Sequence, residues 1–142
     1  MDSIELSSSL RNAISGLHKS LRKQMFSADN YSMTELETIG HLFRSTSLLP
    51  TELAALTHIT TQSMSQILTK MEKQNIIKRT PSKEDKRKVY ISLTPAGKKL
   101  VLKRRYEKDE WLKAVIDKSL TDKEKELLAK ILPLLNKLIE TK

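Results

Sequence analysis

The sequence predicts a mainly α-helical fold with one small β-hairpin, and three observations support it. Apolar residues recur every three or four positions over most of the chain, which is the spacing of an amphipathic helix. Residues 88–93 instead alternate strictly between polar and apolar side chains, as a half-buried strand does. Several of the periodic segments begin with Ser or Thr, followed either by Glu three positions later or directly by Pro, as expected of capped helix starts.

The first part of the chain is predicted to form two helices separated by a turn. Residues 4–26 carry one apolar stripe, made of Leu6, Leu10, Ile14, Leu17 and Leu21. The polar cluster at 27–31 is typical of a turn. Ser32 and Glu35 then have the spacing of a capping box, so a second helix is expected to run from there to about residue 44.

Two short periodic segments follow, and their junction predicts a helix-turn-helix. The first, 51–58, places Leu53 and Leu56 on one side. The second has Thr60 as its N-cap, and its expected buried face consists of Ile59, Met64, Ile67, Leu68 and Met71. Only residues 58–60 remain for the connection, which requires a sharp corner. Asn75 is expected to end the second helix because Asn tolerates the left-handed conformation.

The remaining elements are a hairpin and two helices. Strands are expected at 76–80 and 88–93, on either side of a charged loop. Thr94 and Pro95 begin a helix to about residue 119, and Thr121 with Glu124 begins the last one. Pro133 should bend that helix or interrupt one of its hydrogen bonds. A helix-turn-helix followed by a hairpin is a winged helix, here flanked by helices at both chain ends.

The charge distribution indicates a surface for a polyanion. The net charge is +9, and residues 73–108 alone carry 13 basic and three acidic side chains. Such a cluster favours nucleic acid as the partner. On charge alone, a lysine-rich solvated surface is an equally good explanation.

Several classes of protein are excluded or disfavoured. The absence of cysteine excludes disulfides and thiolate metal sites. The polar start of the chain has no secretory signal pattern, and no apolar run reaches the ~18 residues of a membrane span, so we expect a cytoplasmic protein with no membrane partner. The histidines have no metal-ligand spacing, and no phosphate loop or catalytic motif is present. We therefore expect no cofactor, no metal and no enzymatic activity.

The second helix of the pair has an exposed face that is polar and almost uncharged, once its expected buried positions are set aside. The residues of this face are Thr61, Gln62, Ser63, Ser65, Gln66, Thr69 and Lys70. Gln can bond adenine in two places, and Ser or Thr can bond bases or phosphates, so this face suits the major groove of DNA. The alternative is an ordinary solvent-facing helix, although such helices usually mix Glu and Lys freely.

The loop between the strands would then reach along the DNA backbone. Its cations are Lys83, Lys86, Arg87 and Lys88, which can contact phosphate oxygens, while an arginine can enter the narrow minor groove. Asp85 is expected to accept hydrogen bonds from Arg87 or from the loop backbone and to stiffen the tip. The alternative is a surface loop that is charged for solubility.

Three short motifs occur in order along residues 53–100: Leu53-Ala54 before the turn, Asp85-x-Arg87 in the wing and Leu93-Thr94-x-x-Gly97 at the next helix. Through these motifs the sequence closely resembles the MarR family of bacterial transcriptional regulators. The resemblance implies a homodimer that binds a pseudo-palindromic operator, usually as a repressor, and that a small phenolic or amphipathic effector releases. It also implies that the seven polar helix residues contact DNA, with Arg87 at the wing tip and Asp85 as its partner; the effector-binding residues are unknown.

Three positions depart from the family pattern, and the absence of cysteine removes the thiol-oxidation branch of the family. Asn75 stands where a glycine usually ends the recognition helix, and Ser82 stands where the wing often has a first aspartate. The usual paired arginines are Lys86 and Arg87 here. The last two departures predict a wing tip that binds less rigidly.

The two chain ends are expected to form a dimerisation domain. The last helix has eight Leu or Ile within 13 residues, a stripe wider than one neighbouring helix covers; the alternative is that the two ends pack on each other within one chain. We therefore expect residues 1–31 and 98–142 to dimerise and residues 32–97 to bind DNA.

Two rival functions remain: a DNA-coating architectural protein, and a basic module for protein or membrane surfaces.

Overall fold

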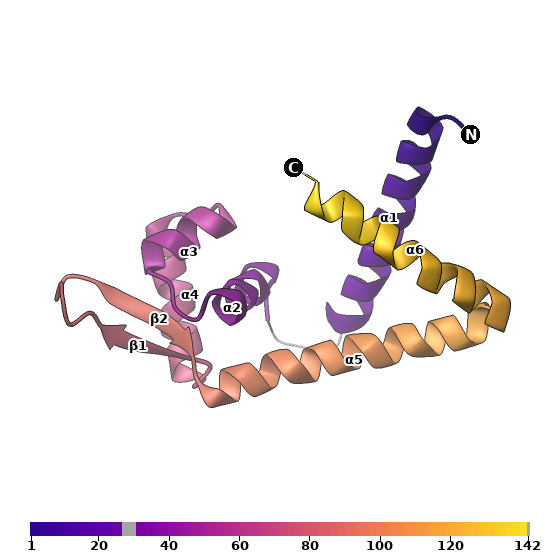
Figure 1. Ribbon diagram of the computed structural model, residues 1–142. Coiled ribbons are helices and arrows are strands. Elements are labelled where there is room, and N and C mark those ends of the chain that lie inside the picture. Colours follow the sequence, from indigo (N-terminus) through magenta and orange to yellow (C-terminus); the bar gives the residue numbers. More distant parts are fainter. Residues whose placement is uncertain (27–30, 142) are drawn as a thin grey trace. The chain divides into compact units, whose positions relative to one another are not determined.

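The protein is described by a computed structural model that covers residues 1–26 and 31–141, in which six helices and one antiparallel hairpin are found (Figure 1). The elements are α1 (Ser3–Phe26), α2 (Met33–Ser45), α3 (Pro50–Thr57), α4 (Thr61–Lys73), β1 (Ile77–Pro81), β2 (Val89–Leu93), α5 (Pro95–Ser119) and α6 (Asp122–Glu140). The predicted mainly α fold with a hairpin wing is confirmed. Residues 27–30 of the predicted turn lie outside the described residues.

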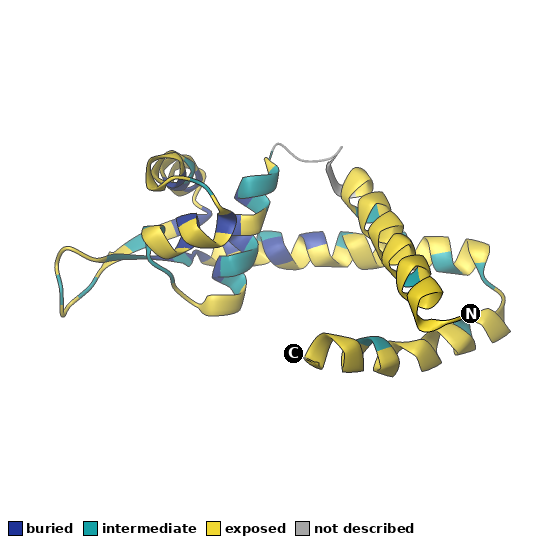
Figure 2. Cartoon of the chain, turned by 90° about the horizontal axis from the view of Figure 1, so that it is seen from above, coloured by how far each residue is buried: buried dark blue, intermediate teal, exposed yellow. Residues whose placement is uncertain are grey.

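The chain falls into two compact units, Met1–Arg105 and Tyr106–Lys142. Within the first, the elements from α2 to β2 and the first turns of α5 share one hydrophobic core, and we call them the lobe. Figure 2 shows buried residues in the lobe, whereas α1 and α6 are exposed along most of their length. The lobe is therefore the part of the chain that builds its own core.

The core of the lobe follows from the apolar spacing of its helices. On α4 the buried residues are Met64, Leu68 and Met71, while Ile59 and Ile67 are half-buried against them. On α3 the buried stripe is Leu53, Ala54 and Thr57. Leu56 was expected on that side and is instead 46% exposed, because on a two-turn helix it lies off the stripe that these three residues define.

The helix-turn-helix corner and the end of α4 both use left-handed residues. His58 has φ 58° and ψ 40°, which turns the chain directly after α3, and Thr60 then caps α4 by accepting a hydrogen bond from the Ser63 amide (3.0 Å). Asn75 has φ 61°, as its tolerance for that conformation predicts. Two such residues allow the chain to reverse twice within a short length, so that α4 lies between α3 and the hairpin.

The hairpin has an antiparallel register that runs from Ile77 opposite Leu93 to Pro81 opposite Val89. Leu48 adds a short bridge to β2: its amide donates to the Ile91 carbonyl (3.0 Å), and the Ile91 amide donates back (2.8 Å). Ile91 and Leu93 are buried, and Val89 is half-buried because it lies next to the loop. The hairpin is thus tied to the lobe at its base and projects at its tip.

The start of α5 is fastened to the end of α4. The Thr94 hydroxyl donates to the Asn75 carbonyl (2.6 Å) and accepts from the Gly97 amide (3.0 Å). Gly97 approaches so closely that an added Cβ would lie 2.2 Å from the Ile76 carbonyl oxygen. Only glycine fits there without a shift of the backbone.

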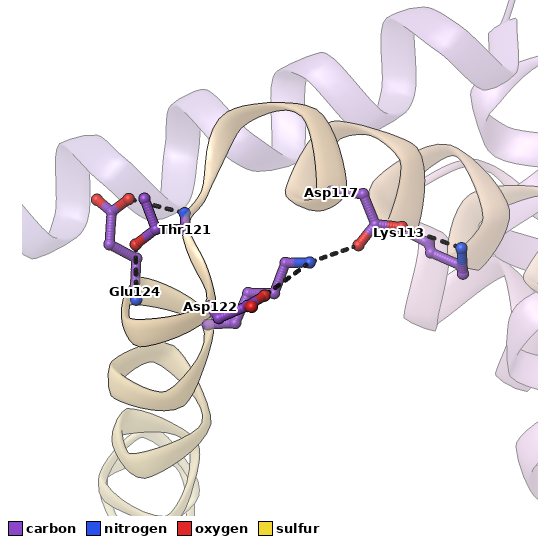
Figure 3. A network of polar contacts seen from close by, with 6 residues as sticks. Lys113, Asp117, Thr121, Asp122 and Glu124 are labelled. Carbon is purple, nitrogen blue, oxygen red and sulfur yellow. Dashed lines mark hydrogen bonds and ion pairs between the residues drawn. The ribbon is translucent and has the colours of Figure 1, made fainter.

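The second unit is a helix corner in which α5 meets α6 through polar contacts (Figure 3). Asp117 accepts from the Lys113 ammonium (3.0 Å) and from the Lys125 ammonium (2.9 Å). Thr121 and Glu124 form the predicted capping box, with the Glu124 amide donating to the threonine hydroxyl (3.2 Å). The α6 helix continues through Pro133, and no residue from 106 to 141 is buried.

Candidate nucleic-acid interface

The exposed face of α4 contains every one of its residues that the sequence predicts to contact DNA. Burial of Met64, Leu68 and Met71 fixes which side of the helix points inward. The residues on the other side are all exposed: Thr61, Gln62, Ser63, Ser65, Gln66, Thr69 and Lys70. The first turn carries no acidic side chain, so its backbone N–H groups present a partial positive charge with no carboxylate beside them.

Intramolecular hydrogen bonds distinguish two groups among these seven residues: Ser63 and Thr69, whose hydroxyls are bonded, and Gln62 and Gln66. The Ser63 hydroxyl accepts from Thr60 (2.9 Å), and the Thr69 hydroxyl donates to the Ser65 carbonyl (2.9 Å). By contrast, no hydrogen bond to the side-chain amides of Gln62 and Gln66 is found within residues 1–26 and 31–141. The two glutamines therefore have their donors and acceptors available to a ligand.

Lys70 belongs to neither group, because its charge is already paired. Its ammonium lies 2.8 Å from Glu35 Oε1, on the first turn of α2. The Glu35 side chain is 7% exposed and that of Lys70 is 49% exposed. The spacing of Ser32 and Glu35 predicts a capping box, and only half of that box forms: the Ser32 hydroxyl accepts from the Glu35 amide (3.1 Å), while the Glu35 carboxylate binds Lys70.

Arg79 is a residue of this surface that sequence reasoning missed. It is half-buried on β1, and its Nε lies 3.4 Å from Glu72 Oε1, the first acid on α4. This pair offsets the negative charge at the end of the exposed face. Its place follows from the register of the hairpin, in which Arg79 pairs with Ile91, and no local sequence pattern gives that register.

The wing tip is organised by hydrogen bonds from its own backbone. The Ser82 hydroxyl accepts from the amides of Glu84 and Asp85, both at 3.3 Å. Asp85 Oδ1 accepts from the Arg87 amide (3.1 Å) and from Arg87 Nε (3.2 Å). The predicted pairing of Asp85 with Arg87 is thus present, and Ser82 closes the turn although it replaces the aspartate of the family pattern.

The electrostatics of the tip favour a fixed ion pair. The amide of Arg87, and after it the guanidinium, holds the pKa of Asp85 below its ordinary value. Arg87 nevertheless remains 92% exposed, and Lys83, Lys86 and Lys88 are exposed as well. Asp85 therefore orients the arginine without removing it from solvent.

A hollow lies between the wing and the start of α3. It has a volume of about 420 Å³ and is open to solvent. Its cationic lining comes from Arg79, Arg87 and Lys88, and residues 49–51 form the opposite wall. The hollow therefore has positive charge on the side that the wing forms.

Other kinds of site receive no support from the described residues. Within residues 1–26 and 31–141, no three His, Cys, Asp or Glu side chains come together where they could hold a metal ion. In the same ranges, no helix combines the length and the apolar character that spanning a bilayer requires.

A helix-turn-helix followed directly by a β-hairpin makes the lobe a winged helix-turn-helix domain. Residues 30–88 match the model of the MarR family. No curated protein matches the chain closely enough in sequence to count as a relative.

Solved structures of transcriptional regulators have the same fold. One, from Pseudomonas aeruginosa PA01 and assigned as a transcriptional regulator, has a TM-score of 0.82 at 26% identity, over 98% of this chain and 96% of that one. A mutant of MepR from S. aureus has a TM-score of 0.72 at 25% identity, over 92% and 97% of the two chains. Another MepR mutant, bound to an oligodeoxyribonucleotide, is similar in fold, with a TM-score of 0.70 at 23% identity over 94% and 97%.

The resemblance to the MarR family is therefore confirmed, by the family model over residues 30–88 and by the fold over nearly the whole chain. These likenesses indicate DNA-binding transcriptional regulation as the coarse function.

Proposed function

We propose that the protein is a homodimeric repressor that binds a pseudo-palindromic DNA operator in a sequence-specific manner. The observation that carries the proposal is the pairing of two surfaces on one lobe: an exposed, nearly uncharged helix face and an exposed cationic wing tip. The first suits base edges, and the second suits phosphates.

In the proposed complex, α4 lies in the major groove. Gln62 and Gln66 hydrogen-bond base edges, because their amides have no partner within the described residues and can bond adenine twice. Thr61 and Ser65 add contacts to bases or phosphates. The N-terminus of α4 points at the backbone, where its amides favour an anion.

The wing follows the backbone to the neighbouring minor groove. Arg87 enters that groove, and Lys83, Lys86 and Lys88 contact phosphates on either side. Asp85 takes part by orienting Arg87, through hydrogen bonds at 3.1 and 3.2 Å. In this arrangement the four cations of the loop bind DNA, and the Asp85 carboxylate holds one of them, Arg87, in position.

The dimer is proposed to form through residues 1–31 and 98–142, with residues 32–97 as the DNA-binding part. The support is the apolar surface that α1 and α6 expose: Ile4, Leu6, Ile14 and Leu17 on the first, and Leu127, Ile131, Leu132, Leu134, Leu138 and Ile139 on the last, each more than 40% exposed. Water-exposed apolar area of that extent usually marks an interface. A twofold dimer would match an operator whose half-sites are about one helical turn apart.

Repression, and release by a small phenolic or amphipathic effector, complete the proposal and rest on the family resemblance alone. An effector that binds the free dimer better than the DNA-bound one would shift the population away from DNA. Titration of a phenolic acid into the protein–DNA complex would test release by an effector, and an unchanged affinity for DNA would contradict it.

The experiment that tests DNA recognition compares two duplexes at fixed salt. Fluorescence anisotropy would measure the Kd for an inverted repeat from the DNA flanking the gene and for a scrambled duplex of the same composition. Specific binding predicts a ratio of about 10³ or more. A ratio near one, with strong salt dependence, would support the architectural reading instead, and no salt-dependent binding would support a protein- or membrane-surface module.

A further inference from the structure

The buried carboxylate of Glu35 is a feature that the proposed contacts do not use. Glu35 lies on α2, with 6% of the residue exposed, and it binds the Lys70 ammonium on α4 at 2.8 Å. The two residues are 35 positions apart in sequence, so the pair links the first turn of one helix to the DNA-facing helix. A buried acid in contact with a proposed DNA-binding surface is unexpected, because DNA is itself an anion.

Glu35 depends on Lys70 for its charge balance. Its second oxygen, Oε2, is buried and has no hydrogen-bond partner within the described residues. If Lys70 turned away toward a phosphate, a buried carboxylate would be left uncompensated, which costs far more than an exposed phosphate contact returns. The ammonium therefore stays with Glu35 when DNA approaches.

Building on the proposed function, we propose that Glu35 is a specificity-determining residue that withholds the Lys70 charge from the DNA backbone. Cationic contacts to phosphate strengthen binding to every sequence equally. By neutralising a lysine in the third turn of α4, Glu35 leaves DNA contacts on this helix to hydrogen bonds from Gln62 and Gln66 in the turns before it. Affinity for random DNA is thereby kept low relative to affinity for the operator.

The inference predicts a particular salt dependence. Each phosphate that a cation neutralises adds about −0.9 to the slope of log K against log salt concentration for B-DNA. Glu35→Gln removes the charge that holds Lys70, so we expect the slope to steepen by about 0.9 per protomer. Binding to a scrambled duplex should tighten more than binding to the operator, and the ratio between them should fall.

Two further variants make the test decisive. Glu35→Gln/Lys70→Gln replaces the ion pair by two amides that can hydrogen-bond to each other, and it should keep the wild-type slope because neither charge meets DNA. Glu37→Gln is the matched control: it removes one exposed negative charge from the same helix and should leave the slope unchanged. Circular dichroism melts would confirm that each variant is folded at the temperature of the titration.

The outcomes separate the inference from the proposed function. Suppose that the wild-type protein prefers the operator. If the slope of the double variant is then shallower than that of the wild type by about 0.9 per protomer, and the slope of Glu35→Gln is not steeper, Lys70 contacts phosphate in the wild type and the inference is wrong. If Glu37→Gln steepens the slope as much as Glu35→Gln does, the effect is general charge and the inference is also wrong. If wild-type protein binds neither duplex, the proposed function fails and the inference with it.

Discussion

Arg87 gains its fixed position from a carboxylate only two residues away. Asp85 accepts from both the amide and the side chain of Arg87, so the guanidinium is oriented before DNA is present. A side chain that is already ordered loses less entropy on binding. The sequence alone predicts this pair because the two residues are only two positions apart in one loop.

The pKa of Asp85 gives the first test at this scale. It lies below the ordinary value, with the Arg87 amide as the larger cause and the guanidinium as the smaller one. Because the folded pKa is depressed, the contribution of the ion pair to tip stability is complete above the ordinary value of 3.8 and is lost only as the pH falls through the folded value. The pair is therefore intact around neutral pH.

Carbon-detected NMR titration would measure this pKa in wild-type protein and in Arg87→Ala. We expect the variant to raise it only part of the way to the ordinary value, because the residue-87 amide still donates to the carboxylate. A complete return would show that the guanidinium is the main cause, and no change would show that the two side chains do not interact in solution.

Gly97 provides a stability test of the contact between α4 and α5. An added Cβ would lie 2.2 Å from the Ile76 carbonyl oxygen, and the backbone would have to move, so Gly97→Ala should lower the free energy of unfolding by about 1–3 kcal/mol. Urea denaturation would measure the change.

Gly40→Ala is the control, because a Cβ there meets only the flexible Arg44 guanidinium, at 3.3 Å. The gain in helix propensity should offset the small adjustment of that side chain. Equal losses from the two substitutions would contradict the close approach at Gly97.

Residues that act across long sequence distances could not be predicted. The polar face of α4 was predictable because its buried stripe has helical spacing, and the wing cations are one run in the sequence. The bond from Lys70 to Glu35 was not, because it joins two helices whose packing no local pattern encodes. Arg79 was missed for the same reason: its position beside α4 depends on the strand register.

At the scale of elements, capping motifs made the helix starts predictable. Thr60 and Thr121 each accept from the amide three residues on, as their patterns predict. The spacing at Ser32 predicts a full box and gives half of one, because the lobe offers Glu35 a cation that competes with its own backbone. Local sequence patterns thus predict where helices begin, whereas tertiary contacts determine which partner a capping side chain binds.

The corner between α5 and α6 depends on Asp117, whose pKa is lowered first by Lys125 and then by Lys113. Asp117→Asn should weaken both ammonium contacts and speed amide hydrogen exchange over residues 117–124, which mass spectrometry would measure. Asp109→Asn is the matched control on the same helix, since no ion pair of Asp109 is found in the part of the chain that the structure describes. Equal exchange in the two variants would show that the corner does not need the Asp117 contacts.

At the scale of the whole molecule, the unequal burial of the chain predicts a dimer. The lobe has its own core, whereas α6 has no buried residue and its Leu134 is 60% exposed. Leu134→Asp should convert a particle of twice 16.3 kDa into one of 16.3 kDa while the lobe stays folded, because an exposed residue contributes little to the core of its own chain. Light scattering after size-exclusion chromatography would measure the mass.

Lys130→Asp is a suitable control for the added charge on α6, where Lys130 is exposed and lies outside the apolar stripe. It should leave the mass unchanged. A wild-type protein that is monomeric at micromolar concentration would contradict the proposed dimer, although it would not affect the surfaces of the lobe that are proposed to bind DNA.

The central claim is that α4 and the wing contact adjacent grooves of the same half-site. Site-specific cross-linking tests it most directly, with a photoreactive benzophenone residue placed at Gln66 in one variant and at Lys86 in another, and at Lys130 as a control. We expect Gln66 to cross-link at bases of the major groove and Lys86 at the backbone or minor groove within the same half-site, and Lys130 to give no product. Cross-links from only one of the first two positions, at saturating DNA, would contradict the claim.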